Sequence, residues 1–283
     1  MKWTIGGVTV TKIVELEVTG GSRFLLPQAA PEAILPITWL QPHFADENGR
    51  LRMSIHSFIV ETADRRIIVD TYLGNGKQNR RMPQWNDRDG PFLADLAEAG
   101  YPAESIDTVL CTHLHVDHVG WNTRLVDGRW VPTFPRAQYL MGRAEYDHWR
   151  TLQDRPDMAH ILADSVAPIV EAGLARMVET DDRICDEISL IPTLGHTPGH
   201  VSVMIQSRGE QALITGDFMH HPCQIAHPEW SAQVDSDPEQ GIATRLEMFR
   251  RLAGTPVLIL GTHFAGVTAG RIVADGDSWR LDV

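Results

Sequence analysis

The sequence predicts an α/β fold in which helices lie outside and sheets lie between them. Strand-like runs come first along the chain, then strands mixed with helices, and this order occurs twice. The 283 residues are 43% hydrophobic and 22% charged, which is an ordinary globular balance. No Pro/Gly/Ser-rich linker or low-complexity tract interrupts the chain, so we expect a single domain over residues 1–283.

Strand signals in the first half are short and apolar. Residues 8–18 alternate polar and apolar side chains, as a half-buried strand does. Residues 54–61 and 65–72 form a strand pair joined by a short turn, and residues 108–112 form a brief apolar run. Residues 91–100 predict a helix, with Pro91 near its start and Gly100 at its end.

The second half repeats this mixture. Strand-like runs are expected at residues 184–191, 201–205, 211–215 and 256–260. Residues 158–172 predict a helix interrupted at Pro168, and residues 237–253 an amphipathic helix with Asp237 as its cap. Residues 271–283 predict a hairpin.

Residues 20–48 are irregular, because several prolines break any regular element. The segment is nevertheless rich in apolar side chains. It is expected either to cover an active site or a subunit interface, which would favour a homodimer, or to pack on its own core.

Charge and cysteine content exclude some classes of function. The net charge of −12 disfavours nucleic acid as a substrate. Cys111, Cys185 and Cys223 form no C-x-x-C pair, which argues against a disulfide framework or a thiolate zinc site. Neither a signal peptide nor a membrane span is evident, so we expect a cytoplasmic enzyme without membrane partners.

The strongest chemical signal is the run H-L-H-V-D-H at residues 113–118, directly after an apolar strand. An H-x-H pair leaving a strand directs both imidazoles to one side, because strand side chains alternate. Imidazole and carboxylate groups are good ligands for zinc and neighbouring metals. His113, His115, Asp117 and His118 are therefore expected to bind metal.

Three further motifs follow strand-like runs in the same manner. They are G-H-T-P-G-H with His196 and His200, T-G-D with Asp217, and G-T-H with His263. Each is weak alone, but a metal site closes through distant segments, and their recurrence after consecutive strands favours one shared site.

Together, in this order, these motifs resemble the metallo-β-lactamase fold superfamily of hydrolases, over roughly residues 54–283. The resemblance implies a four-layer αββα sandwich with two mixed sheets flanked by helices, which matches the layers inferred above. It also implies two divalent metal ions, zinc in the first place, with Mn²⁺, Fe²⁺ or Co²⁺ as alternatives. No organic cofactor is expected.

Carried over by position, the resemblance assigns the metal ligands as follows: His113, His115 and His196 on one ion, Asp117, His118 and His263 on the other, and Asp217 bridging both. Asp70 matches a family residue that orients a ligand imidazole. His200 is expected to support the turn at residues 195–199.

A mechanism follows from two adjacent metals. Divalent ions about 3.5–4 Å apart can share a water and lower its pKa towards ~7 from ~15.7. The metal-bridging hydroxide would then attack the carbonyl of a lactone or ester, and one metal would polarise the carbonyl oxygen. The resemblance makes Asp117 the expected proton shuttle.

Details of the motifs indicate which branch of the superfamily the chain resembles. Flavodiiron reductases carry Glu at the position of His115, so His115 argues against that branch. True metallo-β-lactamases generally lack the bridging carboxylate that Asp217 would provide. Both residues therefore favour lactonases and the methyl parathion hydrolase-like enzymes. Lactonases place a Tyr three residues after that Asp, whereas this chain has His220, as the phosphotriesterase-like relatives do. His220 would either donate a hydrogen bond to the substrate carbonyl or line the pocket. Lactone, ester and phosphotriester substrates all stay open.

Aromatic and apolar residues near the motifs suggest an apolar or aromatic ester or lactone as substrate, with core packing as the alternative. These residues are Trp39, Leu40, Trp85, Trp121 and Phe218. Two other functions of the superfamily remain open: a mononuclear iron enzyme similar to persulfide dioxygenases, and a thioester hydrolase similar to glyoxalase II.

Overall fold

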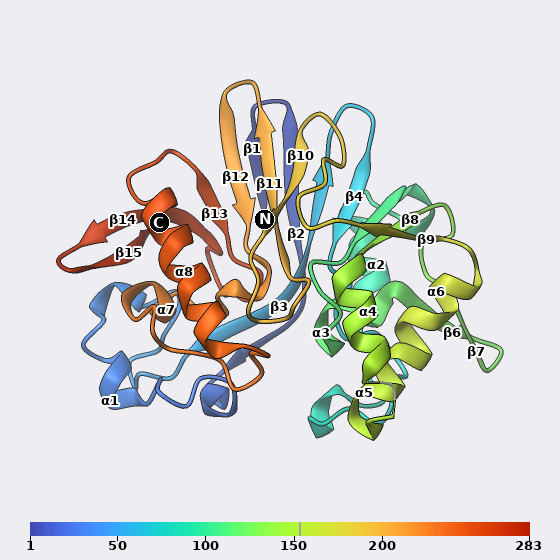
Figure 1. Cartoon of the computed structure of the whole chain (residues 1–283), viewed down its shortest axis with the longest axis horizontal. Helices are drawn as coiled ribbons and strands as arrows, with labels where there is room; N and C mark the ends of the chain where they lie inside the picture. The colour runs from blue at the N-terminus through green and yellow to red at the C-terminus, as the bar shows by residue number, and fades with distance from the viewer. Residues whose placement is uncertain (153) are drawn as a thin grey trace. The chain divides into compact units, whose positions relative to one another are not determined.

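The computed structural model describes residues 1–152 and 154–283, which fall into two compact units (Figure 1). Unit 1 consists of Met1–Glu15 and His56–Thr180, and unit 2 of Leu16–Ile55 and Asp181–Val283. Each unit is thus built from two stretches of the chain. The single domain expected for residues 1–283 stays a prediction.

Unit 1 is organised on a mixed sheet with the strand order β1-β2-β3-β4-β5-β8-β9. Its strands are β1 (Lys2–Ile5), β2 (Val8–Thr19), β3 (Arg52–Glu61), β4 (Arg66–Val69), β5 (Thr108–Leu110), β8 (Gln138–Gly142) and β9 (Ala175–Val178), and a separate pair is β6 (Thr123–Val126) and β7 (Arg129–Pro132). Its helices are α2 (Phe92–Glu98), α3 (Val116–Val119), α4 (Arg143–Thr151), α5 (Pro156–Ile161) and α6 (Ala167–Glu171). Helix α4 packs against β8 and β9 (Figure 1).

Unit 2 holds a second mixed sheet, with the strands in sequence order from β10 to β15. They are β10 (Ile188–Pro192), β11 (Val201–Ser207), β12 (Glu210–Ile214), β13 (Leu258–Leu260), β14 (Ala269–Asp275) and β15 (Ser278–Asp282). The helices are α1 (Pro31–Ile34), α7 (Cys223–Ala226) and α8 (Pro238–Leu252), and α8 packs on β14 (Figure 1). The expected α/β fold with two mixed sheets and accompanying helices is confirmed.

Most expected elements are present, but several strands are shorter than their apolar runs. Strand β4 ends at Val69, where residues 65–72 were expected to continue, because Asp70 and Tyr72 adopt left-handed backbone angles with φ 57° and 58°. Strand β10 begins only at Ile188. The interruption expected in the helix at Pro168 lies just before it, as a π-helical turn over Leu162–Val166, and Pro168 occupies the first turn of α6.

Helix α8 begins as its sequence predicts. The side chain of Asp237 accepts a hydrogen bond from the backbone N–H of Gln240 at 3.0 Å, and Pro238 occupies the first helical position. Of Ile242, Leu246 and Phe249, which the amphipathic pattern places on one apolar face, only Phe249 is fully buried in the core cluster of unit 2, and the other two are half-buried. The buried face of the helix consists of Gly241, Arg245, Met248, Phe249 and Leu252. The cap therefore fixes where α8 starts, whereas the face that the helix buries is rotated from the expected stripe and includes Arg245.

The irregular segment at residues 20–48 contributes to the core of unit 2. Leu26, Ile34, Leu40 and Phe44 are buried there in the same cluster as Phe264. Of the two interpretations, packing on its own core therefore applies to these side chains.

Parallel strand pairs determine where the chemically active side chains emerge. In unit 1, β4 and β5 run parallel with Val69 opposite Leu110, so Asp70 and the loop carrying His113 leave the same sheet edge. In unit 2, β12 and β13 run parallel with Ile214 opposite Leu260. Each unit therefore presents polar side chains where the parallel strands named here end.

A buried lysine is an unexpected feature of unit 1. Lys77 is fully buried, and its Nζ donates to Thr123 Oγ1 at 2.6 Å and to the Asp164 carbonyl at 2.9 Å. Its Nζ also lies 3.6 Å from the centre of the Trp130 ring, and Arg80 pairs with both carboxylate oxygens of Asp164. Burial is the largest influence on the Lys77 amine and lowers its pKa to about 7, although the Asp164 carboxylate acts in the opposite direction.

This depressed pKa predicts a pH dependence of stability. Between about pH 7 and 10.5 the unfolded chain keeps the Lys77 proton and the folded chain releases it, so the free energy of unfolding should rise with pH in this window. One proton limits this slope to about 1.4 kcal/mol per pH unit. Urea unfolding between pH 7.5 and 9 should show the rise in the native protein and its loss in Lys77→Met. The exposed Lys2→Met is the control, and equal slopes in native and Lys77→Met proteins would contradict the prediction.

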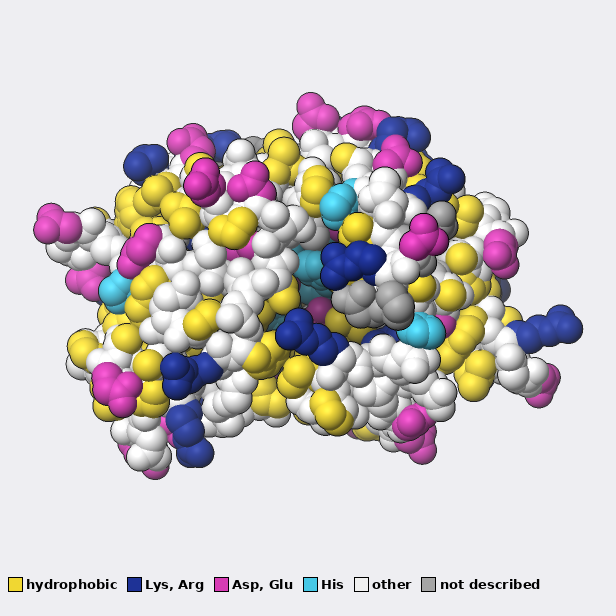
Figure 2. All heavy atoms as spheres, turned by 60° about the horizontal axis from the view of Figure 1, so that its bottom comes forward, with side chains coloured by type: hydrophobic (Ala, Val, Ile, Leu, Met, Phe, Trp, Pro, Cys, Tyr) yellow, Lys and Arg dark blue, Asp and Glu magenta, His cyan; other side chains and the backbone are white. Residues whose placement is uncertain are grey.

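Within residues 1–152 and 154–283, no helix combines the length and apolarity needed to cross a bilayer. On the face that Figure 2 draws, Lys and Arg side chains are scattered among acidic and apolar ones.

Candidate active site

The expected ligands of unit 1 occupy the loop after β5 and the short helix α3. His113 and His118 are completely buried, and Asp117 is partly accessible. His113 Nε2 and His115 Nδ1 lie 3.0 Å apart, and His118 Nε2 lies 3.8 Å from Asp117 Oδ1. Unit 1 thus brings its four expected ligands together as two adjacent pairs of donor atoms.

Asp70 orients one of these imidazoles, as expected. Its Oδ2 lies 2.9 Å from His118 Nδ1, and it also accepts hydrogen bonds from the N–H and the hydroxyl of Thr112, each at 2.8 Å. A carboxylate can only accept here, so His118 donates through Nδ1 and presents Nε2 as a lone-pair donor.

The loop between the first two histidines is held by Glu145, a residue of α4. Its Oε1 accepts hydrogen bonds from the N–H of Leu114 at 3.1 Å and from the indole N–H of Trp149 at 2.6 Å. The Trp149 ring in turn contacts the His115 imidazole edge-on at 5.4 Å between centres. Helix α4 therefore holds the backbone of Leu114 and contacts the ring of His115, which supports the H-x-H segment.

Asp217 is the centre of the arrangement in unit 2. It lies in a 3₁₀ turn over Gly216–Phe218, directly after β12. Its Oδ2 is 3.6 Å from His196 Nε2 and 3.2 Å from His220 Nε2, whereas its Oδ1 is 3.3 Å from His263 Nε2. The two carboxylate oxygens of Asp217 therefore face different histidines.

Two of these histidines are oriented through their other ring nitrogen. His196 Nδ1 lies 2.8 Å from Asp235 Oδ1, and His263 Nδ1 lies 3.0 Å from the carbonyl oxygen of Ser54. Both partners are acceptors, so each imidazole carries its proton on Nδ1 and presents the lone pair of Nε2. This is the state in which imidazole binds a metal ion.

His200 fixes the backbone at Asp217. Its Nε2 accepts a hydrogen bond from the Asp217 N–H at 2.7 Å, and its Nδ1 donates to the Thr193 carbonyl at 2.9 Å. An added Cβ on Gly216 would meet His200 Nε2 at 2.5 Å, so glycine is required for this close approach. The backbone N–H of His200 also donates to the Thr197 carbonyl at 3.4 Å, so His200 contacts the turn at residues 195–199 as well as the turn that carries Asp217.

His220 is the residue where the sequence left two interpretations open. It is 2% exposed, and its backbone N–H donates to Gln224 Oε1 at 2.7 Å. Its ring lies parallel to that of His263 at 6.0 Å between centres and meets the His196 ring edge-on at 4.8 Å. The structure therefore brings His220 against Asp217 and both oriented histidines of unit 2.

The aromatic side chains considered as a pocket lining are mostly in packed positions. Leu40 and Phe218 belong to the core cluster of unit 2, and Trp39 packs against it. Trp121 is buried in unit 1, where it stacks on Phe92 and donates its indole N–H to Glu15 at 3.0 Å. For these residues the structure favours the core-packing alternative.

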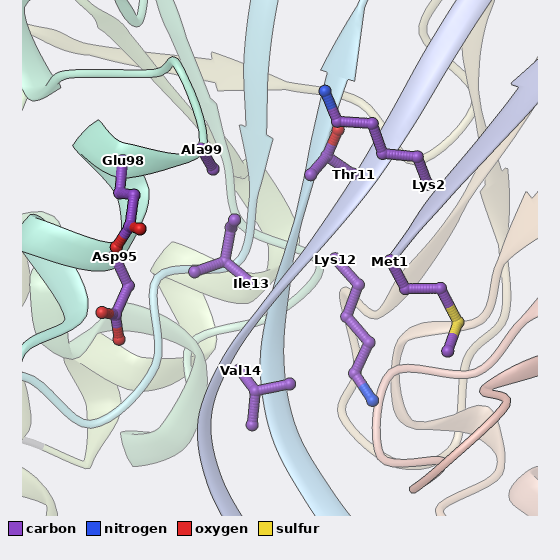
Figure 3. A pocket seen from close by; sticks show the side chains of 9 residues that line it. All are labelled: Met1, Lys2, Thr11, Lys12, Ile13, Val14, Asp95, Glu98 and Ala99. Atoms are coloured by element: carbon purple, nitrogen blue, oxygen red, sulfur yellow. The ribbon is translucent and has the colours of Figure 1, made fainter.

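A cavity of about 380 Å³ lies elsewhere in unit 1. Figure 3 shows its walls, with Lys2 and Lys12 from the first two strands and Asp95 and Glu98 from α2. None of the residues that line it belongs to the expected ligand set.

Sequence reasoning missed three polar residues that support the site: Asp235, Glu145 and Arg245. Asp235 lies in a loop with no motif. Glu145 is one of several acidic residues in a mostly polar helical segment, so the sequence does not distinguish it from a surface residue. Arg245 lies on the amphipathic helix α8, where a charged residue is ordinarily exposed, but here it is 1% exposed. No pattern in a single sequence marks these partners.

Comparison with known proteins shows the family of the chain. Residues 50–262 match the metallo-beta-lactamase superfamily. An N-acyl homoserine lactonase of Bacillus cereus is 24% identical over 169 residues, which are 56% of this chain and 60% of that protein. The chain therefore spans about three-fifths of the length of this curated lactonase.

Two solved structures share the fold over nearly the whole chain. One is hydrolase AbOPH of the beta-lactamase superfamily, with 25% identity, a TM-score of 0.80, and coverage of 100% of this chain and 96% of that one. The other is AidC, a dizinc quorum-quenching lactonase in complex with a product, with 20% identity, a TM-score of 0.77, and coverage of 99% and 96%.

The fold and this family match place the chain among the proteins of the metallo-β-lactamase fold. It belongs to the metallo-β-lactamase superfamily.

Proposed function

We propose that the protein is a two-metal hydrolase that opens lactones, with carboxylic esters as related substrates. Its ligands would be those expected from the sequence: His113, His115 and His196 for one ion, Asp117, His118 and His263 for the other, and Asp217 for both. The proposal goes beyond family membership, because members of one superfamily can catalyse different reactions.

One observation carries the proposal: each carboxylate oxygen of Asp217 faces its own oriented imidazole. Oδ2 is 3.6 Å from His196 Nε2, and Oδ1 is 3.3 Å from His263 Nε2. Ligand atoms on one tetrahedral zinc ion lie about 3.3 Å apart, given bonds of about 2.0–2.1 Å. A carboxylate with a suitable partner on each side is what a bridge between two ions requires.

The donor chemistry also fits two ions of the zinc type. His118, His196 and His263 each present Nε2 because Nδ1 is engaged by Asp70, Asp235 or the Ser54 carbonyl. The pairs His113/His115 and Asp117/His118 add neutral nitrogen and carboxylate oxygen donors. Histidine and carboxylate without thiolate are compatible with zinc, manganese, iron and cobalt.

When bound, two such ions supply a water whose pKa is lowered towards ~7 and an electrophile for the carbonyl oxygen. The residues of the chain then determine where protons go. Asp117 is the candidate proton shuttle, since its side chain is partly accessible and adjacent to His118. His220, 3.2 Å from Asp217 through Nε2, is the candidate donor to the oxygen that becomes negative during attack.

The substrate class rests on the relatives together with the site. The matched curated proteins include N-acyl homoserine lactonases, and AidC is a lactonase. These histidines and aspartates would hold two ions that supply the electrophile, and Asp117 is a candidate proton shuttle, which suits hydrolysis of a neutral cyclic ester. We therefore propose an apolar lactone as the preferred substrate class.

A substrate panel on protein of measured metal content tests this proposal. It should include acyl homoserine lactones, simple γ- and δ-lactones, aryl esters, a thioester and a phosphotriester. We expect the highest kcat/KM for lactones and at least about 100-fold loss in His263→Ala, which removes an expected ligand. His227→Gln alters a half-buried histidine outside the expected ligand set; this variant is the matched control and should be unaffected.

Two results would contradict the proposal. Hydrolysis confined to thioesters would point to a glyoxalase II-like enzyme. One iron per chain with oxygen consumption on a persulfide would point to a dioxygenase. Faster turnover of phosphotriesters than of lactones would show that phosphotriesters are the preferred substrate class, and the proposal of a two-metal centre would stand.

A further inference from the structure

Arg245, a buried guanidinium on α8, contacts both sides of the ligand arrangement in unit 2. It is 1% exposed, and its Nη1 donates to the carbonyl of Phe218 at 3.0 Å, next in sequence to Asp217. The same Nη1 lies 3.9 Å from Asp235 Oδ2, and the other oxygen of Asp235 holds His196. One side chain therefore reaches the turn of Asp217 and the carboxylate behind His196.

We propose that Asp235 and Arg245 are a positioning pair that sets the distance between His196 Nε2 and Asp217 Oδ2. This inference rests on the proposed two-metal function. It assigns to these two residues the positioning of the ligands of one ion, namely the ion that His196 would bind.

Several contacts make the pair rigid. Asp235 Oδ2 accepts the N–H of Ala232 at 3.0 Å, so both oxygens of this carboxylate are engaged. Arg245 also donates through Nε to the Pro228 carbonyl at 3.0 Å and through Nη2 to Ser231 Oγ at 3.3 Å. A planar guanidinium with this many fixed acceptors has one available orientation.

The backbone around His196 is tied to the same helix. The carbonyl of His196 accepts the N–H of Ser236 at 2.9 Å, and Thr244 of α8 donates to the Leu194 carbonyl at 2.7 Å. An added Cβ on Gly195 would meet the backbone N of Gly241 at 2.3 Å, so the loop lies directly on α8. Helix α8, which carries Arg245, and the loop that carries His196 thus pack directly against each other.

The opposite charges of Asp235 and Arg245 explain why both residues are needed. A carboxylate behind an imidazole makes that ligand more basic and fixes its orientation. Left alone in the interior, the Asp235 carboxylate would carry a large desolvation cost, which the nearby guanidinium offsets. Asp70 behind His118 is held instead by the N–H and the hydroxyl of Thr112, which both donate to its carboxylate.

Metal titration of the apo-protein tests the inference without reference to turnover. Zinc uptake, followed by competition with a chromophoric chelator, should resolve two affinities, and His196→Ala and His118→Ala identify which step belongs to which ion. In Asp235→Asn we expect the His196 step to weaken 10–100-fold, the range for lost partners of ligands, with the His118 step unchanged. Arg245→Lys should weaken the same step about 10-fold, because an ammonium cannot make the same set of contacts.

Two matched controls separate positioning from folding. Asp237→Asn alters a carboxylate two residues away that only caps α8, and Arg250→Lys alters an exposed arginine of the same helix. Both should retain both zinc affinities. The inference is overturned if Asp235→Asn and Arg245→Lys leave both steps unchanged, or weaken both steps equally. A native protein that binds two zinc ions but hydrolyses nothing on the panel would refute the proposed function while this inference stands.

Discussion

Asp217→Ala is expected to lose metal and activity together. The substitution removes both oxygens that face His196 and His263, so neither ion keeps its bridging ligand. We expect fewer than two ions per chain after dialysis and a fall in lactone kcat/KM of more than about 100-fold, beyond the 10–100-fold typical of residues that only orient a ligand. Metal analysis and lactone kinetics on the same sample measure both effects.

Asp186→Ala is the control for this variant, because the Asp186 side chain is 95% exposed. Circular dichroism should show that Asp217→Ala remains folded, since alanine keeps the backbone N–H that donates to His200, and His200 keeps its hydrogen bond to the Thr193 carbonyl. A folded Asp217→Ala protein with full metal occupancy and native rates would refute the bridging role.

Gly120→Ala is expected to cause the largest loss of stability. Gly120 has ordinary helical angles, φ −58° and ψ −50°, so alanine meets no conformational obstacle there. A Cβ would nevertheless lie 2.0 Å from the carbonyl oxygen of Leu73 and 2.3 Å from that of Tyr72. Because both are backbone atoms, relief requires the two segments to separate, and we expect a loss of more than about 3 kcal/mol of unfolding free energy.

The segments in question hold His118. The N–H of Thr71 donates to the His118 carbonyl at 2.7 Å, and the Gly120 N–H donates to the Tyr72 carbonyl. Gly173→Ala is the control, because Gly173 has a left-handed φ of 71° with no atom within 4 Å of an added Cβ. It should cost only about 1–2 kcal/mol. Equal urea midpoints for the two variants would show that the contact at Gly120 is relieved more easily than we infer.

The ligand motifs could be predicted from the sequence because their chemistry is concentrated. His113 to His118 place four donors in six positions, and Asp217 and His263 each follow a buried strand. Parallel pairing of β4 with β5 and of β12 with β13 then brings the strand ends together within each unit. Local spacing and recurrence after strands were enough to predict these motifs as ligands, and the family resemblance then assigned each of them to an ion.

The supporting residues could not be predicted, because their roles depend on tertiary contacts. Helix α4 shows this: its buried residues are Glu145 and Trp149, and a charged residue on the inner face gives no apolar period. Glu145 is tolerated there because it accepts hydrogen bonds, among them those from the N–H of Leu114 and the indole of Trp149. Lys77 and Arg245 are similar, since a sequence pattern places both at the surface and the structure buries them.

The metal content of the active protein tests the central claim most directly. Apo-protein should be reconstituted with increasing zinc, and bound metal and lactone hydrolysis should be measured on each sample. We predict that two ions bind per chain and that activity reaches its maximum only when both are present. Full lactonase activity with one ion per chain, or a single iron with oxygen consumption and no hydrolysis, would contradict a bridged two-metal centre at Asp217.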